Sequence, residues 1–535
     1  MRSNNSLIRY YLIVNFLLFS AVCIYAQPTE QWVNRYNSPS NSADFVKSMT
    51  VDNSGNIIVT GNAGNTITTI KYSPAGAELW VKTHSAGTNN TVYDIVTDNS
   101  GNIIITGEEN QGSFNMLTIK YDPAGNVLWL QRYNGPSNMG DFSRKTVCDV
   151  ANNIFITGFS ETSAATNDLV TIKYNPSGIL QWVNNFGVSV PDIFDMKLDP
   201  TTRNIYVCGA LSPSTNGVAF LEKIPPTGIM SNLQIFDYVS SDGYEAFTSL
   251  AVNNAGTDIY VTGRSWSGPA FGDDYITVKY NSSLFLQWSQ RYNGLGSGMD
   301  IAHSLVIDNN ENVYSAGFSD GGASALFDVA IAKYSTLGVP LGFQRYNTGQ
   351  INEVVYKMKI DPAQNIYLTG MINNDVLLLK YNNALTLQWA KTYNSPANED
   401  DSAVDIMLAN TGDIYLAGTS RGIGTGNDFL TIKYSQTVGI VQISADIPKA
   451  FALSQNYPNP FNPETNIRFD IPNDADVKIV VYDMLGRVVQ LLADEFKQAG
   501  SYEVSFDASA ISSGTYFYKI TAGNFTDIKK MVLIK

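Results

Sequence analysis

TIKY stands at residues 69–72, 118–121, 171–174 and 431–434 of this chain of 535 residues. TVKY at 277–280, IAKY at 331–334, LLKY at 378–381 and LEKI at 221–224 are variants of the same motif. A segment such as NIIVTG precedes each copy and ends at a glycine: Gly61, Gly107, Gly158, Gly209, Gly263, Gly317, Gly370 and Gly418. Consecutive glycines are 46 to 54 residues apart. The chain therefore contains eight repeats, with a period found in propellers and solenoids.

Each repeat contains four short segments that are typical of β-strands. In the second repeat they are TVYDIVTD, NIIITG, MLTIKY and VLWLQRY, joined by DNSG, a longer polar loop and DPAGN. Tyr, Phe, Thr, Val and Ile are plentiful, and no helical pattern lies between the segments. Four strands in a repeat of this length predict an all-β fold in which each repeat is one blade of a β-propeller.

The order of the segments predicts how the propeller closes. The segment QWVNRY at 31–36 has the sequence of a fourth strand, whereas the last repeat ends on the third-strand sequence FLTIKY. We expect residues 31–37 to complete the last of eight blades, because this pairs two otherwise bare strand edges. The competing segment for this place is VGIVQI at 438–443.

The fourth strands share an aromatic residue, which is Trp32, Trp80, Trp129, Trp182, Trp288 or Trp389, and Phe343 in one repeat. We interpret these rings as apolar wedges between neighbouring blades, because every repeat needs the same filler at the same place. The alternative role is a platform for sugars.

The TIKY-like motifs also repeat a lysine at one position: Lys71, Lys120, Lys173, Lys223, Lys279, Lys333, Lys380 and Lys433. We expect the ammonium group to pair with the carboxylate six residues before the motif's tyrosine, which is Asp168, Asp274, Asp328, Asp375 or Asp428. These aspartates are also placed to close the preceding turn. One carboxylate per blade is too few oxygens for calcium.

The N-terminal segment predicts export. Arg2 and Arg9 precede an uncharged apolar run, so residues 1–26 are interpreted as a signal peptide cleaved after Ala26, with a lipid anchor at Cys23 as the alternative. Two cysteines then remain, Cys148 and Cys208, and both are expected to be buried thiols. No transmembrane segment is expected in the mature protein. The formal net charge of -14 disfavours nucleic acid and anionic membrane surfaces as partners.

The repeats resemble a known family of bacterial proteins. The pattern of NIIVTG, TIKY, SPAG and Trp over residues 27–443 is similar to the bacterial β-propeller repeat family, which is often seven-bladed, so seven blades is the alternative to eight. The layout also resembles that of pyrroloquinoline-quinone propellers, whose Trp follows a Gly turn. No vicinal cysteine pair is present, and no cofactor, metal or catalytic residue is predicted from this resemblance.

The repeats end before a linker at 444–450, and residues 451–535 have a different sequence character. They contain FALSQNYPNPFNPETNIRFDIP, VYDMLGR, SGTYFYKI and KKMVLIK in this order. The segments closely resemble the C-terminal sorting domain of the type IX secretion system. The residues that carry the motif are Tyr457, Pro458, Asn459, Pro460, Gly486, Arg487, Lys529, Lys530 and Lys535.

This resemblance implies a small immunoglobulin-like β-sandwich and an interaction with the secretion machinery. It also implies secretion, or attachment to the outer-membrane surface of a Gram-negative bacterium. The sorting domain is usually removed after export.

No catalytic motif is found in the chain, which has only two histidines, His84 and His303. We interpret the protein as a secreted or surface-attached binding propeller, adhesin-like or capturing a glycan or protein. The alternatives are a glycosidase or lyase that uses carboxylates, and a passive scaffold.

The loops between second and third strands vary most in length, from NAGN to RSWSGPAFGD, and loops that vary on a fixed scaffold often bind ligands. The loop RSWSGPAFGD contains Trp266, outside the repeated packing position. We therefore predict a ligand site at Arg264, Trp266, Phe271, Asp273 and Asp274. In the alternative interpretation Trp266 covers the edge of its own blade.

Overall fold

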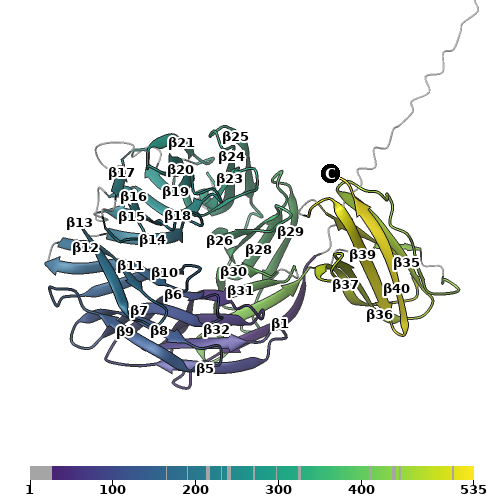
Figure 1. Ribbon diagram of the computed structural model, residues 1–535, viewed down its shortest axis with the longest axis horizontal. Coiled ribbons are helices and arrows are strands. Elements are labelled where there is room, and N and C mark those ends of the chain that lie inside the picture. Colours follow the sequence, from purple (N-terminus) through teal and green to yellow (C-terminus); the bar gives the residue numbers. More distant parts are fainter. Residues whose placement is uncertain are drawn as a thin grey trace, which may run out of the picture.

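The computed structural model describes residues 27–163, 166–188, 191–211, 217–229, 232–237, 243–268, 272–296, 298–322, 327–409, 412–436, 441–444, 447–508 and 511–535. The expected signal peptide, residues 1–26, lies outside the described residues. Across the described ranges every regular element is a β-strand, and the strands form ten four-stranded antiparallel sheets (Figure 1). The predicted all-β fold is confirmed.

Seven of the sheets each consist of four consecutive strands. The first four are β2 (Asp44–Val51), β3 (Ile57–Ala63), β4 (Thr66–Tyr72), β5 (Glu78–His84); β6 (Asn90–Thr97), β7 (Ile103–Asn110), β8 (Phe114–Tyr121), β9 (Val127–Tyr133); β10 (Asp141–Cys148), β11 (Ile154–Ser163), β12 (Thr166–Tyr174), β13 (Leu180–Val188); and β14 (Pro191–Leu198), β15 (Ile205–Leu211), β16 (Val218–Ile224), β17 (Asn232–Phe236). The next three are β18 (Ala246–Val252), β19 (Asp258–Trp266), β20 (Asp273–Asn281), β21 (Leu286–Tyr292); β22 (Ile301–Ile307), β23 (Val313–Asp320), β24 (Phe327–Tyr334), β25 (Pro340–Tyr346); and β26 (Val354–Ile360), β27 (Ile366–Ile372), β28 (Asp375–Tyr381), β29 (Leu387–Tyr393).

The eighth sheet joins the beginning of the described chain to its last repeat. Its order is β30 (Asp401–Leu408), β31 (Ile414–Gly422), β32 (Gly426–Ser435) and β1 (Thr29–Tyr36). Strand β1 pairs antiparallel with β32, with Trp32 opposite Lys433, so the predicted closure by the N-terminal strand is confirmed. The competing segment contributes β33 (Val441–Ser444), which pairs instead with a strand of the C-terminal module.

The eight sheets follow one another around a common centre, as propeller blades do. The first strand of each sheet contacts the first strands of both neighbouring sheets, and the series returns from β30 to β2. Figure 1 shows these first strands toward the middle and the fourth strands at the periphery. Apolar side chains fill the junctions: Ile58 and Ile67 of one sheet pack with Val92, Ile95 and Ile103 of the next.

Every first strand contains a β-bulge, and the bulge explains the glycine that ends each NIIVTG-like segment. The strand register shifts at the bulge. In β6, for example, Val92 is opposite Gly107 and Asp94 is opposite Thr106, so Tyr93 between them has no partner. A Cβ atom at Gly107 would collide with the backbone carbonyl oxygen of Thr91, and the other seven glycines meet the equivalent carbonyl. Only glycine leaves room for this approach.

The repeated tryptophans join neighbouring sheets, as predicted. The indole N–H of Trp32, Trp80, Trp129, Trp182 or Trp288 donates a hydrogen bond of 3.0–3.2 Å to a carbonyl in the third-to-fourth turn of the next sheet. The ring covers the glycine of that turn; Trp129, for example, lies against Gly178. Packing and hydrogen bonding both occupy the ring, so we assign it a structural role.

The motif lysines pair with carboxylates, but the predicted partner is wrong. Lys71, Lys120, Lys279 and Lys433 form salt bridges of 2.8–3.0 Å with Asp52, Asp98, Asp258 and Asp413, which lie in the first-to-second turns or, for Asp258, at the start of the second strand. The motif lysine lies at the end of the third strand, beside that turn. The aspartate six residues before the tyrosine lies at the other end of the strand, about 16 Å away.

The aspartates at that far end pair with arginines of the fourth strand. Asp274 pairs with Arg291, Asp328 with Arg345, and Asp428 with Arg35 at 3.1 Å. The repeats thus separate their carboxylates into two sets, one at each end of the third strand.

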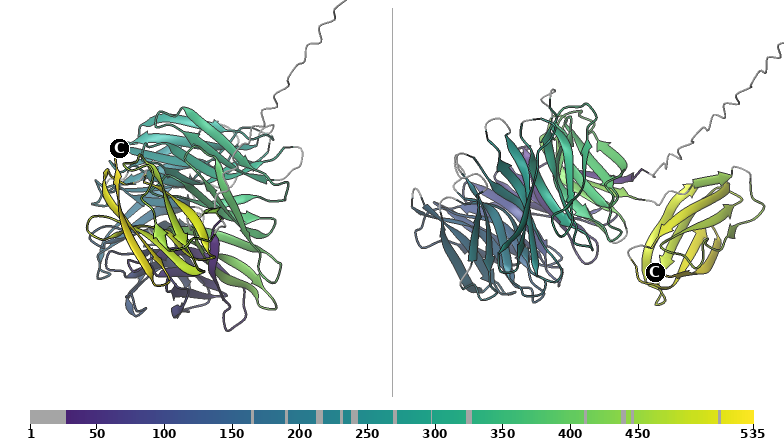
Figure 2. Two further views of the ribbon diagram at one scale, coloured as in Figure 1. Left: turned by 90° about the vertical axis from the view of Figure 1, so that its right-hand side faces the viewer. Right: turned by 90° about the horizontal axis from the view of Figure 1, so that it is seen from above.

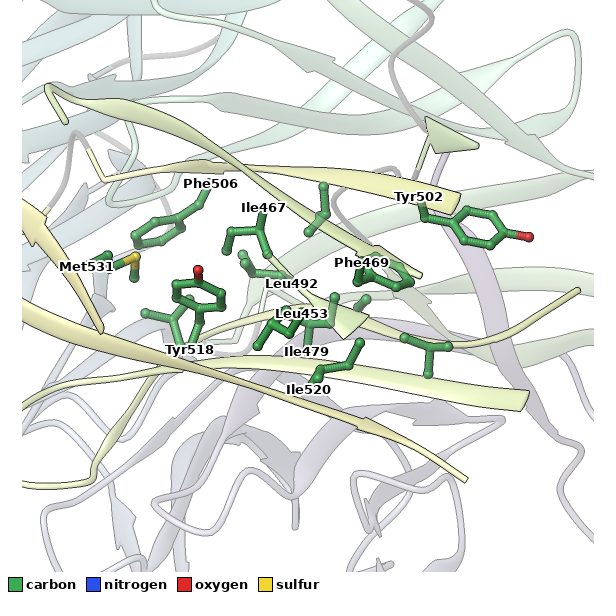
Figure 3. Packing of buried hydrophobic residues seen from close by; sticks show 14 of the residues in the cluster. Leu453, Ile467, Phe469, Ile479, Leu492, Tyr502, Phe506, Tyr518, Ile520 and Met531 are labelled. Carbon is green, nitrogen blue, oxygen red and sulfur yellow. The ribbon is translucent and has the colours of Figure 1, made fainter. Parts of the chain in front are cut away.

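The C-terminal module consists of the two remaining sheets. One has the order β33, β38 (Gly500–Asp507), β35 (Glu464–Ile471), β34 (Ala452–Leu453); the other has β37 (Val488–Lys497), β36 (Ala475–Tyr482), β39 (Gly514–Ala522), β40 (Phe525–Leu533). Figure 2 shows the module beside the repeat sheets, and Figure 3 shows Ile467 and Phe506 of one sheet opposite Tyr518 and Ile520 of the other.

We predict that Gly107→Ala lowers the free energy of unfolding by about 2–3 kcal/mol, because the methyl group forces the bulged strand away. Gly187→Ala is the matched control: Gly187 is also a strand glycine, but its added Cβ would lie 3.7 Å from the nearest atom, the Oδ1 of Asp168. Denaturant unfolding of both variants measures the difference. Equal stability of the two variants would contradict the bulge explanation.

Candidate functional site

Two kinds of loop share one face of the repeat sheets. The backbone N–H of Gly64, between β3 and β4, donates to Ala43, which precedes β2, and Glu245, which precedes β18, donates to Gly217, which precedes β16. The loops that vary in length and the loops that connect successive sheets therefore meet on one face.

Buried carboxylates hold the loops between sheets in place. Asp44, Asp141, Asp300 and Asp401 accept the backbone N–H of the residue six positions earlier at 2.6–2.8 Å. Burial raises the pKa of Asp44, Asp141 and Asp300, and the hydrogen bonds oppose this shift. These carboxylates are occupied by the chain itself, so we assign them to loop structure rather than to a ligand.

Most of the predicted loop residues come together at the end of the β19–β20 hairpin. Arg264 pairs with Asp273 at 3.3 Å, and its guanidinium lies 3.9 Å from the centre of the Tyr244 ring. Asp274 accepts a hydrogen bond from Ser267 and pairs with Arg291. Phe271 lies outside the described residues.

Trp266 ends strand β19, opposite Asp273. It is half-buried and lies directly against Gly243, in the segment that leads into β18 of the same sheet. This contact is what the edge-covering interpretation requires. The ligand site at this hairpin stays a prediction.

The bulges bring a second group of side chains to the centre of the molecule. Each bulge leaves one residue without a partner in the strand register, and we call these residues the bulge ring: Lys47, Tyr93, Arg144, Phe194, Thr248, His303, Tyr356 and Val404. Lys47 is exposed and the other seven are half-buried. They lie on the innermost strands, so they surround the centre of the ring of sheets.

Side chains of the bulge ring contact one another across sheet junctions. The guanidinium carbon of Arg144 lies 4.3 Å from the ring centre of Tyr93 and 5.0 Å from that of Phe159. The Tyr93 hydroxyl donates to Glu108 at 3.2 Å, and Glu108 also pairs with Arg144 at 3.4 Å. Burial raises the pKa of Glu108. The result is a flat cation among aromatic rings.

A second aromatic group lies farther around the ring. His303 contacts Phe318 and Tyr356, with ring centres 5.4 and 5.9 Å away. Burial, with a smaller contribution from the charge of Arg264, lowers the pKa of His303 to about 4, so the imidazole is neutral at pH 7. Arg264 of the predicted loop site thus lies near the bulge ring. Sequence inspection missed this ring, although the glycine of each repeat marks its position.

The described residues contain no group of three or more His, Cys, Asp or Glu side chains placed to hold a metal ion. Within the same ranges no helix is long and apolar enough to cross a membrane. The two cysteines in the described ranges are free thiols; Cys208 is buried as predicted, and Cys148 is half-buried. A cavity of about 310 Å³ lies away from the innermost strands and includes Lys82 and His84 of β5.

The sorting-motif residues gather at one end of the C-terminal module. Asn459 accepts the N–H of Val532, and Phe461 exchanges backbone hydrogen bonds with Val532 and Ile534, so the Pro-rich segment lies against β40. Gly486 has a φ of 76° in the turn that Asp483 closes, and Arg487 pairs with Asp483 at 2.7 Å.

Most of the motif's polar surface remains accessible. Tyr457 is 81% exposed. Lys530 and Lys535 are exposed, and Lys529 lies 3.6 Å from Asp527.

Residues 455–535 match the protein family described as "Secretion system C-terminal sorting domain". The sorting domain inferred from the sequence is confirmed. It indicates secretion or a cell-surface location and an interaction with the secretion machinery. No curated protein matches the chain.

Several solved structures are similar to the chain at low identity. The propeller domain of the Trilobed protease from Pyrococcus furiosus is 7% identical, with 64% of this chain and 94% of that chain covered and a TM-score of 0.38. The periplasmic gluconolactonase PpgL of Pseudomonas aeruginosa is 11% identical, with 65% and 98% covered and a TM-score of 0.40. The WD40 repeats of RRP9 are 10% identical, with 76% and 100% covered and a TM-score of 0.39.

We predict that Trp129→Ala costs about 3–5 kcal/mol of unfolding free energy, because it removes both the wedge and the hydrogen bond to Pro176. Trp266→Ala removes a half-buried ring without a place in the repeated packing, and we expect a smaller loss, of about 1 kcal/mol. Thermal or denaturant unfolding of both variants checks this. A loss at Trp266 as large as that at Trp129 would identify the hairpin as structural and remove it as a ligand site.

Proposed function

We propose that the protein is a secreted or cell-surface β-propeller of eight blades that binds carbohydrate at the mouth of its central channel. The observation that carries the proposal is the bulge ring, where Arg144 lies among Tyr93, Phe142 and Phe159 beside the innermost strands. Aromatic faces stack on sugar rings, and neighbouring polar groups orient the hydroxyls.

Eight blades, rather than seven, are supported by the contacts of the innermost strands. Eight first strands form one cycle, and hydrogen bonds close it: the N–H of Met49 in β2 donates to Asp405 in β30. The repeat region of this proposal spans residues 27–443, and the sorting module has an immunoglobulin-like sandwich architecture.

Binding is favoured over turnover because the buried carboxylates have internal partners. Asp141 is held by Gly135 and Ser160, and Asp273 by Arg264. Hydrolysis of glycosides uses two carboxyl groups that face each other across a cleft. The hairpin of Arg264 and Trp266 lies beside the bulge ring and extends the proposed surface.

We predict that Tyr93→Ala and Tyr356→Ala each weaken carbohydrate binding by about tenfold, which corresponds to about 1.4 kcal/mol. The experiment screens residues 27–535 on a glycan array and then measures the affinity of the variants for the best glycan. Tyr457→Ala is the control, because this exposed tyrosine belongs to the sorting module. Unchanged binding in both channel variants would place the site elsewhere, and release of reducing ends from the bound glycan would favour the enzyme alternative.

Export is proposed to use both ends of the chain. The signal peptide of residues 1–26 is removed on entry to the periplasm of a Gram-negative host, and the module then directs passage across the outer membrane through the type IX machinery. The machinery is expected to contact the exposed motif residues around Tyr457 and Lys530.

We predict that a chain ending after Gln436 stays in the periplasm with its propeller folded, because the address lies in a separate pair of sheets. Gln436 is kept because it accepts hydrogen bonds from Tyr367 and Lys380. Cell fractionation and protease resistance measure location and folding, with the full-length chain as control. Truncated protein at the cell surface or in the medium would contradict the proposed export route.

A further inference from the structure

A second ring of side chains lies one residue beyond the bulge ring. It consists of Ser48, Asp94, Lys145, Asp195, Ser249, Ser304, Lys357 and Asp405, one from each first strand. Its members lie on the innermost strands, directly after the bulges, and Lys357 is coupled electrostatically to Asp94, Asp195 and Asp405 on three other sheets, so this ring also surrounds the centre. We call this layer the second ring.

Oxygen atoms of the second ring accept backbone N–H groups from the next sheet. Asp94 accepts from Thr146, Ser304 accepts from Met358, and Asp405 accepts from Met49, at 3.0–3.1 Å. Ser249 and Asp195 make the same kind of bond to Leu305 and Leu250. The second ring therefore serves first as a set of acceptors that link neighbouring first strands.

A lysine side chain has no hydrogen-bond acceptor atom. The hydrogen-bond pattern of the second ring therefore changes at its two lysines. After Lys145 comes Asp195, which accepts the N–H of its own neighbour Met196; after Lys357 comes Asp405, which accepts the N–H of Ile406 in the same way. Each carboxylate replaces the acceptor that the preceding lysine does not provide. Lys145 and Lys357 therefore have no part in the hydrogen bonds that link neighbouring first strands.

The carboxylates do not neutralise these lysines by direct contact. Every oxygen of Asp94, Asp195 and Asp405 already accepts at least one hydrogen bond, from backbone N–H groups and from Ser48, Lys197 or Ser249. Within the described ranges, the ammonium groups of Lys145 and Lys357 form no hydrogen bond and no salt bridge within 4.0 Å.

Two further lysines follow two residues later on the same strands, Lys197 after Asp195 and Lys359 after Lys357. Lys197 pairs with Asp195 at 2.6 Å, whereas Lys359 has no such partner in the described part of the chain. These layers hold four lysines against three aspartates. They carry a net positive charge inside a protein whose formal charge is -14.

Charged groups on different sheets of the second ring affect one another's pKa. Burial alone would lower the pKa of Lys357, but Asp405, Asp195 and Asp94 together raise it, so the ammonium is charged. Burial lowers the pKa of Lys359; Asp405 opposes this shift, while Lys357 and Lys197 add to it. An anion placed between these lysines would relieve their repulsion.

We propose that Lys145, Lys357 and Lys359 form an anion site in the channel that binds the carboxylate groups of an acidic oligosaccharide built from uronic acids. The inference rests on the proposed carbohydrate site and deepens it. The sugar rings stack on the aromatic side chains of the bulge ring, and the carboxylates reach the lysines of the adjacent layers. Arg144, directly before Lys145, adds a cation at the same level as the aromatics.

The test compares trigalacturonic acid, neutral galactotriose and inorganic phosphate as ligands of residues 27–535 by calorimetry. Lys357→Gln and Lys359→Gln are measured separately, so that a folding defect in one leaves the other informative. Lys391→Gln, on the outer strand β29 of the same sheet, is the matched control. We expect each channel variant to weaken trigalacturonate binding at least tenfold and the control to change it less than twofold. We also expect high salt to weaken wild-type binding.

Each contrary outcome has a distinct meaning. Unchanged trigalacturonate affinity in both channel variants would overturn the lysine site. Galactotriose binding as tight as that of the acidic sugar would overturn this inference and leave the proposed carbohydrate function standing. Binding of neither sugar to the wild type would contradict the proposed function as well. If phosphate binds as tightly as trigalacturonate, the lysines bind a phosphate group rather than a sugar carboxylate, and the inference is overturned.

Discussion

The repeat sheets depend on one shared hydrogen-bond acceptor, the carbonyl of the second residue in the third-to-fourth turn. Pro74, Pro123, Pro176 and Thr336 each accept both an indole N–H and a lysine ammonium from the preceding sheet. The lysine is held by its salt bridge to the first-to-second turn. One carbonyl thereby connects two turns of two sheets. At these four junctions the position of one sheet follows from that of its neighbour.

Spacing and strand patterning were sufficient to predict the strands, the closure by β1 and the packing role of tryptophan, because these features repeat with the sequence. The lysine partner was predicted wrongly because a count along the chain does not show which end of an antiparallel strand lies beside which turn. The bulge ring escaped prediction for a related reason. A bulge displaces the two-residue alternation of a strand, so residues such as Arg144 and Tyr356 have no signature of their own.

The candidate site shows how far loop variation indicates function. A long loop drew attention to Arg264 and Trp266, yet Arg264 has partners within the chain and Trp266 covers Gly243. The first strands, which show no such variation in length, carry the charged and aromatic side chains of the bulge ring and the second ring. Their arrangement depends on contacts between residues about 50 positions apart, such as Arg144 and Tyr93. Only the folded ring brings such residues together.

Closure by β1 also bears on how such a protein changes in evolution. The strand that completes the last sheet precedes the first repeat in the sequence. The closing sheet is therefore built from both ends of the repeat region. Duplication or loss of one repeat inside the gene leaves both ends of the closing sheet intact. Each new repeat brings its own turn carbonyl, tryptophan and lysine. Blade number is therefore free to vary by whole units, while selection acts on single channel positions.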